Sequence, residues 1–420
     1  MSAMKTRTIV EYILISAIVL MLGSLVGWYF FLRAQTNTTV AQSAARGFGI
    51  PIPEGDANGA NSSSFPSARA GTPSTQSNQR PVQLWHVEAK PTAGHSFVGS
   101  GKNLRLHYVD RAGGYVFEAN PETGQVLRLT NTLLPKIYEA LLSENGHVVL
   151  RSLDTAGGIT TFIGTLSTTT DSSNASSSAA ALSGSYLEKN ILRISANPIT
   201  GSLVYVVRGS SGGAVMSAEW NGEKQKTLLE SAITSWRPLA LADGRSAVIQ
   251  AAADNVLGYG YELKQGSAPS PILGPIAGLM MRIRPPTEKS SSDAVLWSQS
   301  VRGELRLFAR INQNATAVQL PVRTIADKCA WAPSGAFIAY CGVPQGSTGQ
   351  NFLDNWYRGA VHSSDVLWRI DASAGTAEMV FTPPSNTPLD IEDISVDRAG
   401  DYIAFTNAAD KSLWLFRVTK

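Results

Sequence analysis

The sequence predicts an all-β protein, a β-propeller of seven blades that follows one transmembrane helix and a flexible linker. Three observations predict it: a strand–turn–strand pattern that recurs along residues 85–420, a spacing of 43–65 residues between successive turns, and an apolar run near the N-terminus. A repeat of about 40–50 residues with several short strands is typical of propeller blades. The predicted parts are a short tail, a transmembrane helix, a linker and the propeller, at residues 1–8, 9–32, 34–83 and 84–420.

The N-terminal apolar run predicts a membrane anchor. Residues 9–32 are almost entirely apolar, and a helix of about 20 residues is long enough to cross a bilayer core. Trp28 and Tyr29 near its end match the aromatic belt of a membrane interface. A cleaved signal peptide is the alternative, but its apolar core is usually only about 7–15 residues long. Because Lys5 and Arg7 precede the run, we expect a single-pass protein of the cell membrane with an extracytoplasmic C-terminal domain.

The next segment has the composition of a linker. Of the 50 residues at 34–83, 39 are Ala, Gly, Ser, Thr, Asn, Gln or Pro. The few apolar residues show no period, so this stretch cannot bury a core. We expect a flexible spacer between the membrane and the propeller.

The recurring pattern is an apolar strand, a turn with glycine, and a strand rich in β-branched and aromatic residues. Turn glycines supply the positive φ that hairpins need. The clear copies are FVGSGKNLRLHYV (97–109), ALLSENGHVVLRS (140–152), ISANPITGSLVYVV (194–207), LALADGRSAVIQ (239–250), CAWAPSGAFIAYC (329–341) and ISVDRAGDYIAFT (394–406). With a looser copy at 281–300, the pattern predicts seven blades, and six or eight remain alternatives.

The two ends of the predicted ring complement each other. The last unit has only three predicted strands before Lys420, and an extra strand, VQLWHVEA (82–89), precedes the first unit. We expect this extra strand to complete the last blade, because such closure joins the ends of the ring and protects its strand edges.

One copy of the pattern resembles a known family. WAPSGAFIAY (331–340) resembles the W-S-P-D-G-x-x-I-A-Y core of the WD-like repeats in bacterial TolB-type propellers, and residues 395–405 and 195–207 are weaker copies. The resemblance implies a propeller fold for residues 85–420 and no particular activity. TolB itself has an additional N-terminal α/β domain, so its role is not carried over to this chain. The layout is more similar to that of uncharacterised membrane-anchored propeller proteins of bacteria.

The charge distribution argues against nucleic-acid binding. The chain has 35 basic and 32 acidic residues, and residues 1–84 hold six of the basic and three of the acidic ones. This leaves 29 residues of each sign for the propeller, which therefore lacks the basic surface that nucleic-acid binding requires. We predict no nucleic-acid partner.

A long insertion is the predicted binding site. Residues 342–365 separate the second and third strands of one blade, on the face that carries the connections between blades. Long structured loops are often functional, and this one is rich in residue types that anchor interfaces. The candidate binding residues are Phe352, Asp354, Asn355, Trp356, Tyr357 and Arg358. The alternative is structural: Phe352 and Trp356, four positions apart on a helical turn, cap the blade or plug the channel.

The two cysteines flank one predicted hairpin. Folding about Ser334 and Gly335 brings Cys329 and Cys341 to within about one residue of being opposite each other. Opposite residues of antiparallel strands have Cα atoms about 4.5–5.5 Å apart, which is within the range of a disulfide. A disulfide is the favoured interpretation, and two buried free thiols are the alternative.

The sequence shows no evident catalytic or cofactor motif. The five histidines follow no metal-binding spacing, and no phosphate-binding loop is present, so we predict no metal and no cofactor. Asp390, Glu392 and Asp393 precede the last blade, and we interpret them as a solvated face rather than a Ca²⁺ site.

Two functions follow from these observations, and a mainly structural protein with no specific ligand is a third interpretation. The first is a membrane-tethered scaffold or recognition module whose partners are the membrane, through its anchor, and a protein or envelope polymer. The second is a hydrolase or lyase acting on an envelope glycan or peptide at the channel mouth, which requires activity that depends on Asp354, His362 or Asp365. We favour the first, because no catalytic constellation is apparent.

Overall fold

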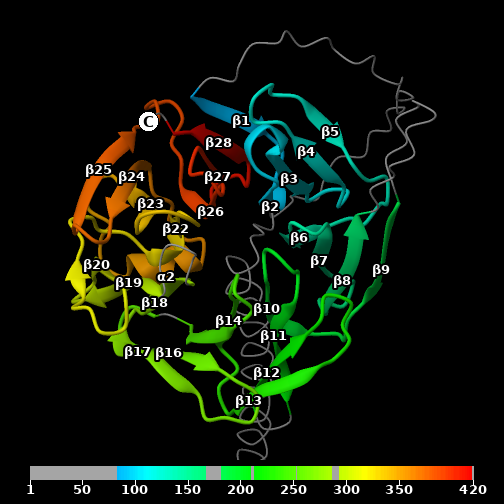
Figure 1. Cartoon of the computed structure of the whole chain (residues 1–420), viewed down its shortest axis with the longest axis horizontal. Coiled ribbons are helices and arrows are strands. Elements are labelled where there is room, and N and C mark those ends of the chain that lie inside the picture. The colour runs from blue at the N-terminus through cyan, green and yellow to red at the C-terminus, as the bar shows by residue number, and fades with distance from the viewer. Residues whose placement is uncertain (1–82, 167–180, 210–211, 252, 286–292, 419–420) are drawn as a thin grey trace, which may run out of the picture.

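The protein folds into a ring of seven antiparallel sheets around a central axis (Figure 1). The computed structural model describes residues 83–420 except 167–180, 210–211, 252, 286–292 and 419–420. The predicted tail and transmembrane helix, and all but the last residue of the predicted linker, lie outside the described residues. Among the described helices, none is long and apolar enough to cross a bilayer.

Each sheet has four strands and forms one blade, so the prediction of seven blades is confirmed. The strands of blade 1 are β2 (Thr92–Val98), β3 (Arg105–Asp110), β4 (Val116–Ala119) and β5 (Val126–Arg128), with the 3-10 turn η1 (Gly101–Asn103). Those of blade 2 are β6 (Ile137–Leu142), β7 (His147–Leu153), β8 (Ile159–Leu166) and β9 (Leu182–Tyr186). Those of blade 3 are β10 (Ile191–Ala196), β11 (Leu203–Gly209), β12 (Gly212–Ala218) and β13 (Lys226–Ser231).

The remaining four blades follow the same order. Blade 4 has β14 (Trp236–Ala240), β15 (Ser246–Gln250), β16 (Leu257–Leu263) and β17 (Ser270–Ala277). Blade 5 has β18 (Met280–Arg284), β19 (Ala294–Val301), β20 (Glu304–Arg310) and β21 (Val318–Gln319). Blade 6 has η2 (Ala326–Lys328), β22 (Cys329–Trp331), β23 (Ile338–Pro344), the helix α2 (Phe352–Tyr357), β24 (Asp365–Asp371) and β25 (Thr376–Phe381). Blade 7 has β26 (Ile391–Val396), β27 (Tyr402–Asn407), β28 (Leu413–Arg417) and β1 (Leu84–Glu88).

The N-terminal strand closes the ring, as the sequence predicts. β1 pairs antiparallel with β28, so blade 7 takes three strands from the C-terminus and one from the N-terminus. This pairing covers the edge of β28, which would otherwise present free backbone groups.

The core lies between the blades. Each of the seven buried apolar clusters joins the facing sides of two neighbouring sheets. Between blades 3 and 4, for example, Val204 and Val206 of β11 pack with Trp236 and Val248. The alternation of the strands produces these faces, and burying one such aliphatic side chain stabilises the fold by about 1.5–3 kcal/mol.

The turn glycines are in the conformation that the hairpin pattern requires. Gly335 and Gly400, for example, have φ values of 76° and 73°. In blade 7, the Asp397 carboxylate also accepts hydrogen bonds from the backbone N–H groups of Asp401 and Tyr402, at 2.7 and 2.6 Å. Local residues therefore fix the hairpin between the first and second strands of a blade.

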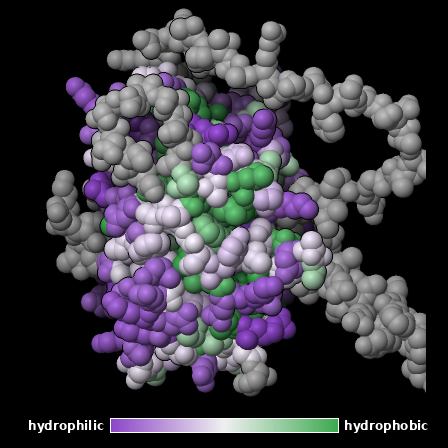
Figure 2. Space-filling view, turned by 90° about the vertical axis from the view of Figure 1, so that its right-hand side faces the viewer, coloured by the Kyte–Doolittle hydropathy of each residue, from purple (hydrophilic) through white to green (hydrophobic). Residues whose placement is uncertain are grey.

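The outer flank of the ring is mixed in polarity. Figure 2 shows apolar patches interspersed with hydrophilic ones on one side of the molecule. Outer strands in this part of the ring expose Leu127 of β5 and Tyr186 of β9. This side of the ring therefore does not form one continuous apolar face.

Candidate functional site

The predicted insertion begins at the end of β23 and reaches β24, and it contains the short helix α2. Because the strands of a blade are antiparallel, the connection between the second and third strands lies on the same side as the connections between blades. We call this side the insertion face. The hairpin turns, such as the one at Gly335, lie on the opposite side.

The apolar side of α2 is part of the core. Phe352, Leu353 and Trp356 are only 5%, 0% and 3% exposed. They belong to the cluster between blades 5 and 6, together with Met280 and Cys329. Phe352 and Trp356 are therefore buried side chains of the core between these two blades.

A buried ion cluster holds the second half of the insertion. The Lys328 ammonium, fully buried, donates to Asp365 and to Asp390 at 2.6 Å each. It also donates to the hydroxyl of Ser363, at 3.0 Å, and lies 4.8 Å from the centre of the Trp356 ring. We call Lys328, Asp365, Asp390, Ser363 and Trp356 the Lys328 cluster. Breaking a buried pair of this kind leaves an uncompensated charge, which costs about 3–5 kcal/mol.

The two carboxylates of the cluster differ in their acidity. Burial raises the pKa of Asp365, and the neighbouring Asp390 raises it further, against the opposing effect of Lys328. Burial also acts to raise the pKa of Asp390, but Lys328 and the Trp356 indole outweigh it and lower that pKa to about 2. The indole donates to Asp390 at 2.8 Å. Asp390 is therefore a buried, ionised anchor, which corrects its interpretation as part of a solvated face.

The start of α2 is held by blade 4. The Asp254 carboxylate accepts a hydrogen bond from the Asp354 backbone N–H, and the Asp354 carboxylate accepts one from the Asp254 backbone N–H, at 3.2 and 3.1 Å. Ser300 of blade 5 donates to the other Asp254 oxygen at 2.9 Å. Asp354 thus connects α2 to the loop between β15 and β16.

The end of α2 is held near the propeller axis. The Tyr357 hydroxyl donates to Asp327 of η2 at 2.6 Å, and Arg237 of β14 pairs with the same carboxylate oxygen at 2.7 Å. Arg282 of β18 lies 3.4 Å from the other oxygen. Burial alone would raise the pKa of Asp327, but Arg237 and Arg282 outweigh it and lower that pKa to about 2. Asp327 is therefore ionised, and it joins three elements.

The exposed part of α2 is smaller than the sequence suggests. Of the six candidate binding residues, Phe352 and Trp356 are core residues, and Asp354 and Tyr357 bond to neighbouring blades. Arg358 is exposed and Asn355 partly exposed. Asp354 and Tyr357 are also partly exposed, but their polar groups bond to neighbouring elements, which leaves Asn355 and Arg358 as the candidates for contact with a partner.

Of the three residues of the enzymatic alternative, His362 and Asp365 both contact the buried Lys328–Asp390 pair, and Asp354 lies apart from them. Asp354 bonds to the blade 4 loop, and Asp365 is fully buried against Lys328. The His362 Nδ1 lies 2.8 Å from Asp390, and its side chain is 44% exposed. All three side chains thus make structural contacts, and they do not meet in one common site. Within the described residues, no group of three or more His, Cys, Asp or Glu side chains could hold a metal ion.

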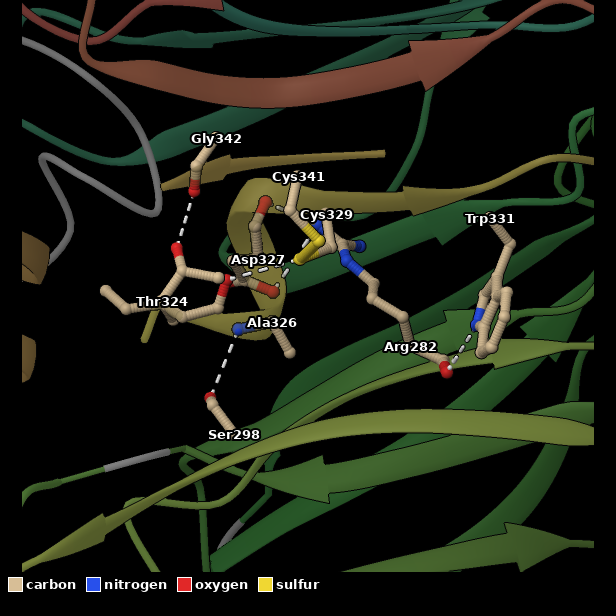
Figure 3. The surroundings of a disulfide bond; sticks show 10 residues. Arg282, Ser298, Thr324, Ala326, Asp327, Cys329, Trp331, Cys341 and Gly342 are labelled. Carbon is tan, nitrogen blue, oxygen red and sulfur yellow. Dashed lines mark hydrogen bonds and ion pairs between the residues drawn. A yellow bond between two sulfur atoms is a disulfide. The ribbon is translucent and has the colours of Figure 1, made fainter. Parts of the chain in front are cut away.

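The two cysteines form a disulfide next to η2, which Cys329 directly follows. Cys329 and Cys341 are direct partners in the β22–β23 pairing, with Cα atoms 4.1 Å apart. Figure 3 shows how neighbouring side chains fix η2 beside this bond. Thr324 donates to the Gly342 carbonyl at 2.6 Å, and the Ser298 hydroxyl accepts from the Ala326 backbone N–H at 3.1 Å. These contacts position Asp327.

A cavity of about 230 Å³ lies elsewhere, between blades 4 and 5. One of its lining residues is Arg245, whose guanidinium contacts the carboxylates of Asp243, Glu262 and Asp293. With its charge used in these contacts, Arg245 connects blade 4 to blade 5. We assign this cavity no role in binding.

Sequence reasoning did not find Lys328, Arg237 or Arg282. Lys328 stands in an unremarkable segment, IADKCA (325–330), and no local signal marks it as buried. The two arginines occupy equivalent positions early in the first strands of their blades. A search for charges at that position of each repeat is the signal that would have found them.

The comparisons with known proteins establish the fold and no family. No protein-family model matches the sequence, and a comparison with curated proteins finds no match. The β-propeller domain of Cps50 (Swd1) from Myceliophthora thermophila is similar at 10% identity, with a TM-score of 0.50, over 80% of this chain and all of that one. An oligogalacturonate lyase in complex with manganese is similar at 12% identity and a TM-score of 0.49, over 79% and 90% of the two chains. An auxiliary nutrient binding protein from Bacteroides thetaiotaomicron is similar at 10% identity and a TM-score of 0.43, over 79% and 70%.

Proposed function

We propose that this chain is a membrane-tethered, extracytoplasmic propeller that binds a protein or an envelope component through its insertion face. One observation carries the proposal: α2 is fixed to three other parts of the ring while Asn355 and Arg358 face solvent. A platform that is already ordered loses little conformational entropy on binding, which favours recognition. The apolar run at 9–32 and the linker support the tethering.

The fixed helix also indicates where the partner meets the protein. Arg is among the residue types that contribute most at interfaces, and it pairs well with carboxylates. Because Arg358 is exposed at the end of α2, we expect an acidic group of the partner to lie against it. The sequence resemblance to TolB-type repeats supports the propeller, and we do not extend it to TolB's role.

The hydrolase or lyase alternative has no support from a specific observation. Asp354 bonds to the blade 4 loop, apart from His362 and Asp365, which both contact the buried Lys328–Asp390 pair. The neutral charge of residues 85–420 likewise supports a partner other than nucleic acid. We therefore propose binding, and no cofactor.

A crosslinking pull-down from native membranes tests the proposal. The bait is the full-length chain, compared with a variant carrying Asn355→Ala and Arg358→Glu. Deletion of 342–365 is unsuitable, because it removes the buried side chains of Leu353 and Trp356. The matched control is Lys264→Glu, an exposed charge reversal in the β16–β17 turn on the opposite side.

The proposal predicts a discrete partner that the Lys264→Glu bait still captures and the α2 variant loses. A partner captured equally by all three baits would contradict binding through the insertion face.

A further inference from the structure

Each blade places one charged residue near the axis at the insertion face. Glu139, Arg193, Arg237, Arg282 and Glu392 are the second or third residues of the first strands of blades 2, 3, 4, 5 and 7. Asp327 precedes the first strand of blade 6, and Arg111 follows β3 in blade 1. We call these seven residues the axial ring. First strands are innermost in each blade (Figure 1), and most neighbouring first strands contact each other around the axis.

Neighbouring members of the axial ring interact. Arg237 and Arg282 both pair with Asp327, at 2.7 and 3.4 Å. Arg193 is close enough to Arg237 and to Glu139 for their charges to influence its ionisation. The charges of Glu139 and Glu392 likewise influence the ionisation of Arg111. The seven side chains therefore form one electrostatic unit.

Solvent reaches the axial ring. A side chain on the innermost strand of a blade is buried if its neighbours fill the axis. The side chains of Arg237 and Arg282 are instead 28% and 33% exposed, and that of Glu139 is 23% exposed. A ligand arriving from the insertion face can therefore contact the arginines.

Positive charge exceeds negative charge at the axial ring. The ring has four arginines and three carboxylates, and two of the carboxylates are also contacted from outside it. The fully buried Arg151 donates to Glu139, and Lys411 pairs with Glu392. The third carboxylate, Asp327, serves two arginines. A site lined with an excess of one sign concentrates ions of the other sign.

Burial acts against the charge of two of the arginines. Burial, with a contribution from Arg237, lowers the pKa of Arg193 to about 10. Burial lowers the pKa of Arg111 to about 10 as well. Both guanidinium groups remain charged at neutral pH, and a bound anion would stabilise that charge.

We infer that the axial ring binds an oxyanion, a carboxylate or phosphate group, held chiefly by Arg193, Arg237 and Arg282. Guanidinium groups donate pairs of parallel hydrogen bonds to such anions, and arginine is suited to this role where water is partly excluded. The inference goes beyond the proposed function, since it uses none of the exposed side chains of α2. The two sites are adjacent, because Tyr357 and Arg237 share Asp327.

Thermal unfolding of the full-length chain in detergent tests the inference. The probes are sodium phosphate and sodium citrate, each compared with sodium chloride of equal ionic strength. Binding of the folded state at a tenfold excess over Kd raises the melting temperature of a domain of this size by about 2 °C. A response to citrate, to phosphate or to both supports the inference and distinguishes the carboxylate from the phosphate as the group bound.

Variants assign the response to the ring. Arg193→Gln and Arg282→Gln are expected to lose the shift, whereas Arg193→Lys keeps part of it. The control is Arg208→Gln, in which an exposed arginine at the end of β11, in the same blade as Arg193, is neutralised. If Arg193→Gln does not fold, Arg282→Gln alone serves as the test variant. Arg282 is chosen over Arg237 because its side chain is more exposed.

Two results would overturn the inference. One is a wild-type melting temperature that neither citrate nor phosphate raises above the chloride value. The other is a shift of equal size in the wild type, Arg193→Gln and Arg282→Gln, which would place the anion elsewhere. A failed pull-down at the insertion helix leaves both measurements unaffected, so the two proposals fail separately.

Discussion

The hydroxyl of Tyr357 lies 2.6 Å from the carboxylate of Asp327, and this contact joins the insertion helix to the propeller axis. Asp327 is at the same time the counter-ion of Arg237 and Arg282. One carboxylate therefore holds both the exposed platform and the inner ring of charges. We therefore expect a structural change at the axis to alter α2, and a change in α2 to alter the axis.

Removal of the Tyr357 hydroxyl tests this connection. Tyr357→Phe leaves the ring in place but removes a hydrogen bond to an ionised acceptor, which is worth about 1.5–3 kcal/mol. We expect the free energy of unfolding, measured in urea, to fall by about that amount. Tyr186→Phe, at an exposed position, is the control and should change it by less than about 0.5 kcal/mol. Equal effects of the two variants would show that the contact contributes nothing.

Loss of Lys328 should be among the most damaging single changes. Lys328→Met leaves two buried carboxylates facing each other, and we expect a loss of about 3–5 kcal/mol in the free energy of unfolding. The double variant Lys328→Met with Asp390→Asn should recover part of this loss, because it removes one of the charges. Denaturant unfolding measures both. A single variant as stable as the wild type would mean that the cluster does not stabilise the insertion.

Acid should weaken the fold through Asp327. Its pKa is about 2 in the folded protein and about 3.9 in an unfolded chain, so its contribution is fully present above the unfolded value. That contribution, about 2–3 kcal/mol, is lost as the pH falls from about 4 to about 2. Asp327→Asn should therefore flatten the dependence of the free energy of unfolding on pH in this window. Asp365, whose raised pKa acts in the opposite direction, remains in both proteins and cancels in the comparison. Parallel curves for the wild type and the variant would contradict this assignment.

The Cys329–Cys341 bond should contribute measurable stability. It closes a loop with a sequence separation of 12, and a cross-link of that size stabilises by about 3 kcal/mol in the chain-entropy model. Thiol labelling of the unfolded, unreduced protein should find no reactive cysteine, and reduction should expose two. Two reactive thiols before reduction would exclude the bond.

Much of the fold could be predicted because its signals are local. The turn glycines, such as Gly335 and Gly400, mark hairpins wherever they occur, and their spacing counts the blades. The extra strand at 82–89 could be assigned to the last blade because that blade lacked one. Strand alternation and turn chemistry need no knowledge of distant contacts.

The candidate site could be predicted only in part because its contacts are distant in the sequence. The spacing of Phe352 and Trp356 predicted one apolar side of a helix, but not what would cover it. Asp390 was assigned to a solvated face, since its partner Lys328 lies 62 residues earlier and gives no local signal. The axial ring draws one residue from each blade, so it becomes visible only when the register of every first strand is known.

Photo-crosslinking from α2 is the most direct test of binding through the insertion face. A photo-crosslinking amino acid at position 358, with the same group at position 264 as the control, is introduced into the full-length chain in native membranes. The account predicts a discrete adduct from position 358 and none from position 264. Adducts from position 264 alone, or from neither position, would contradict it.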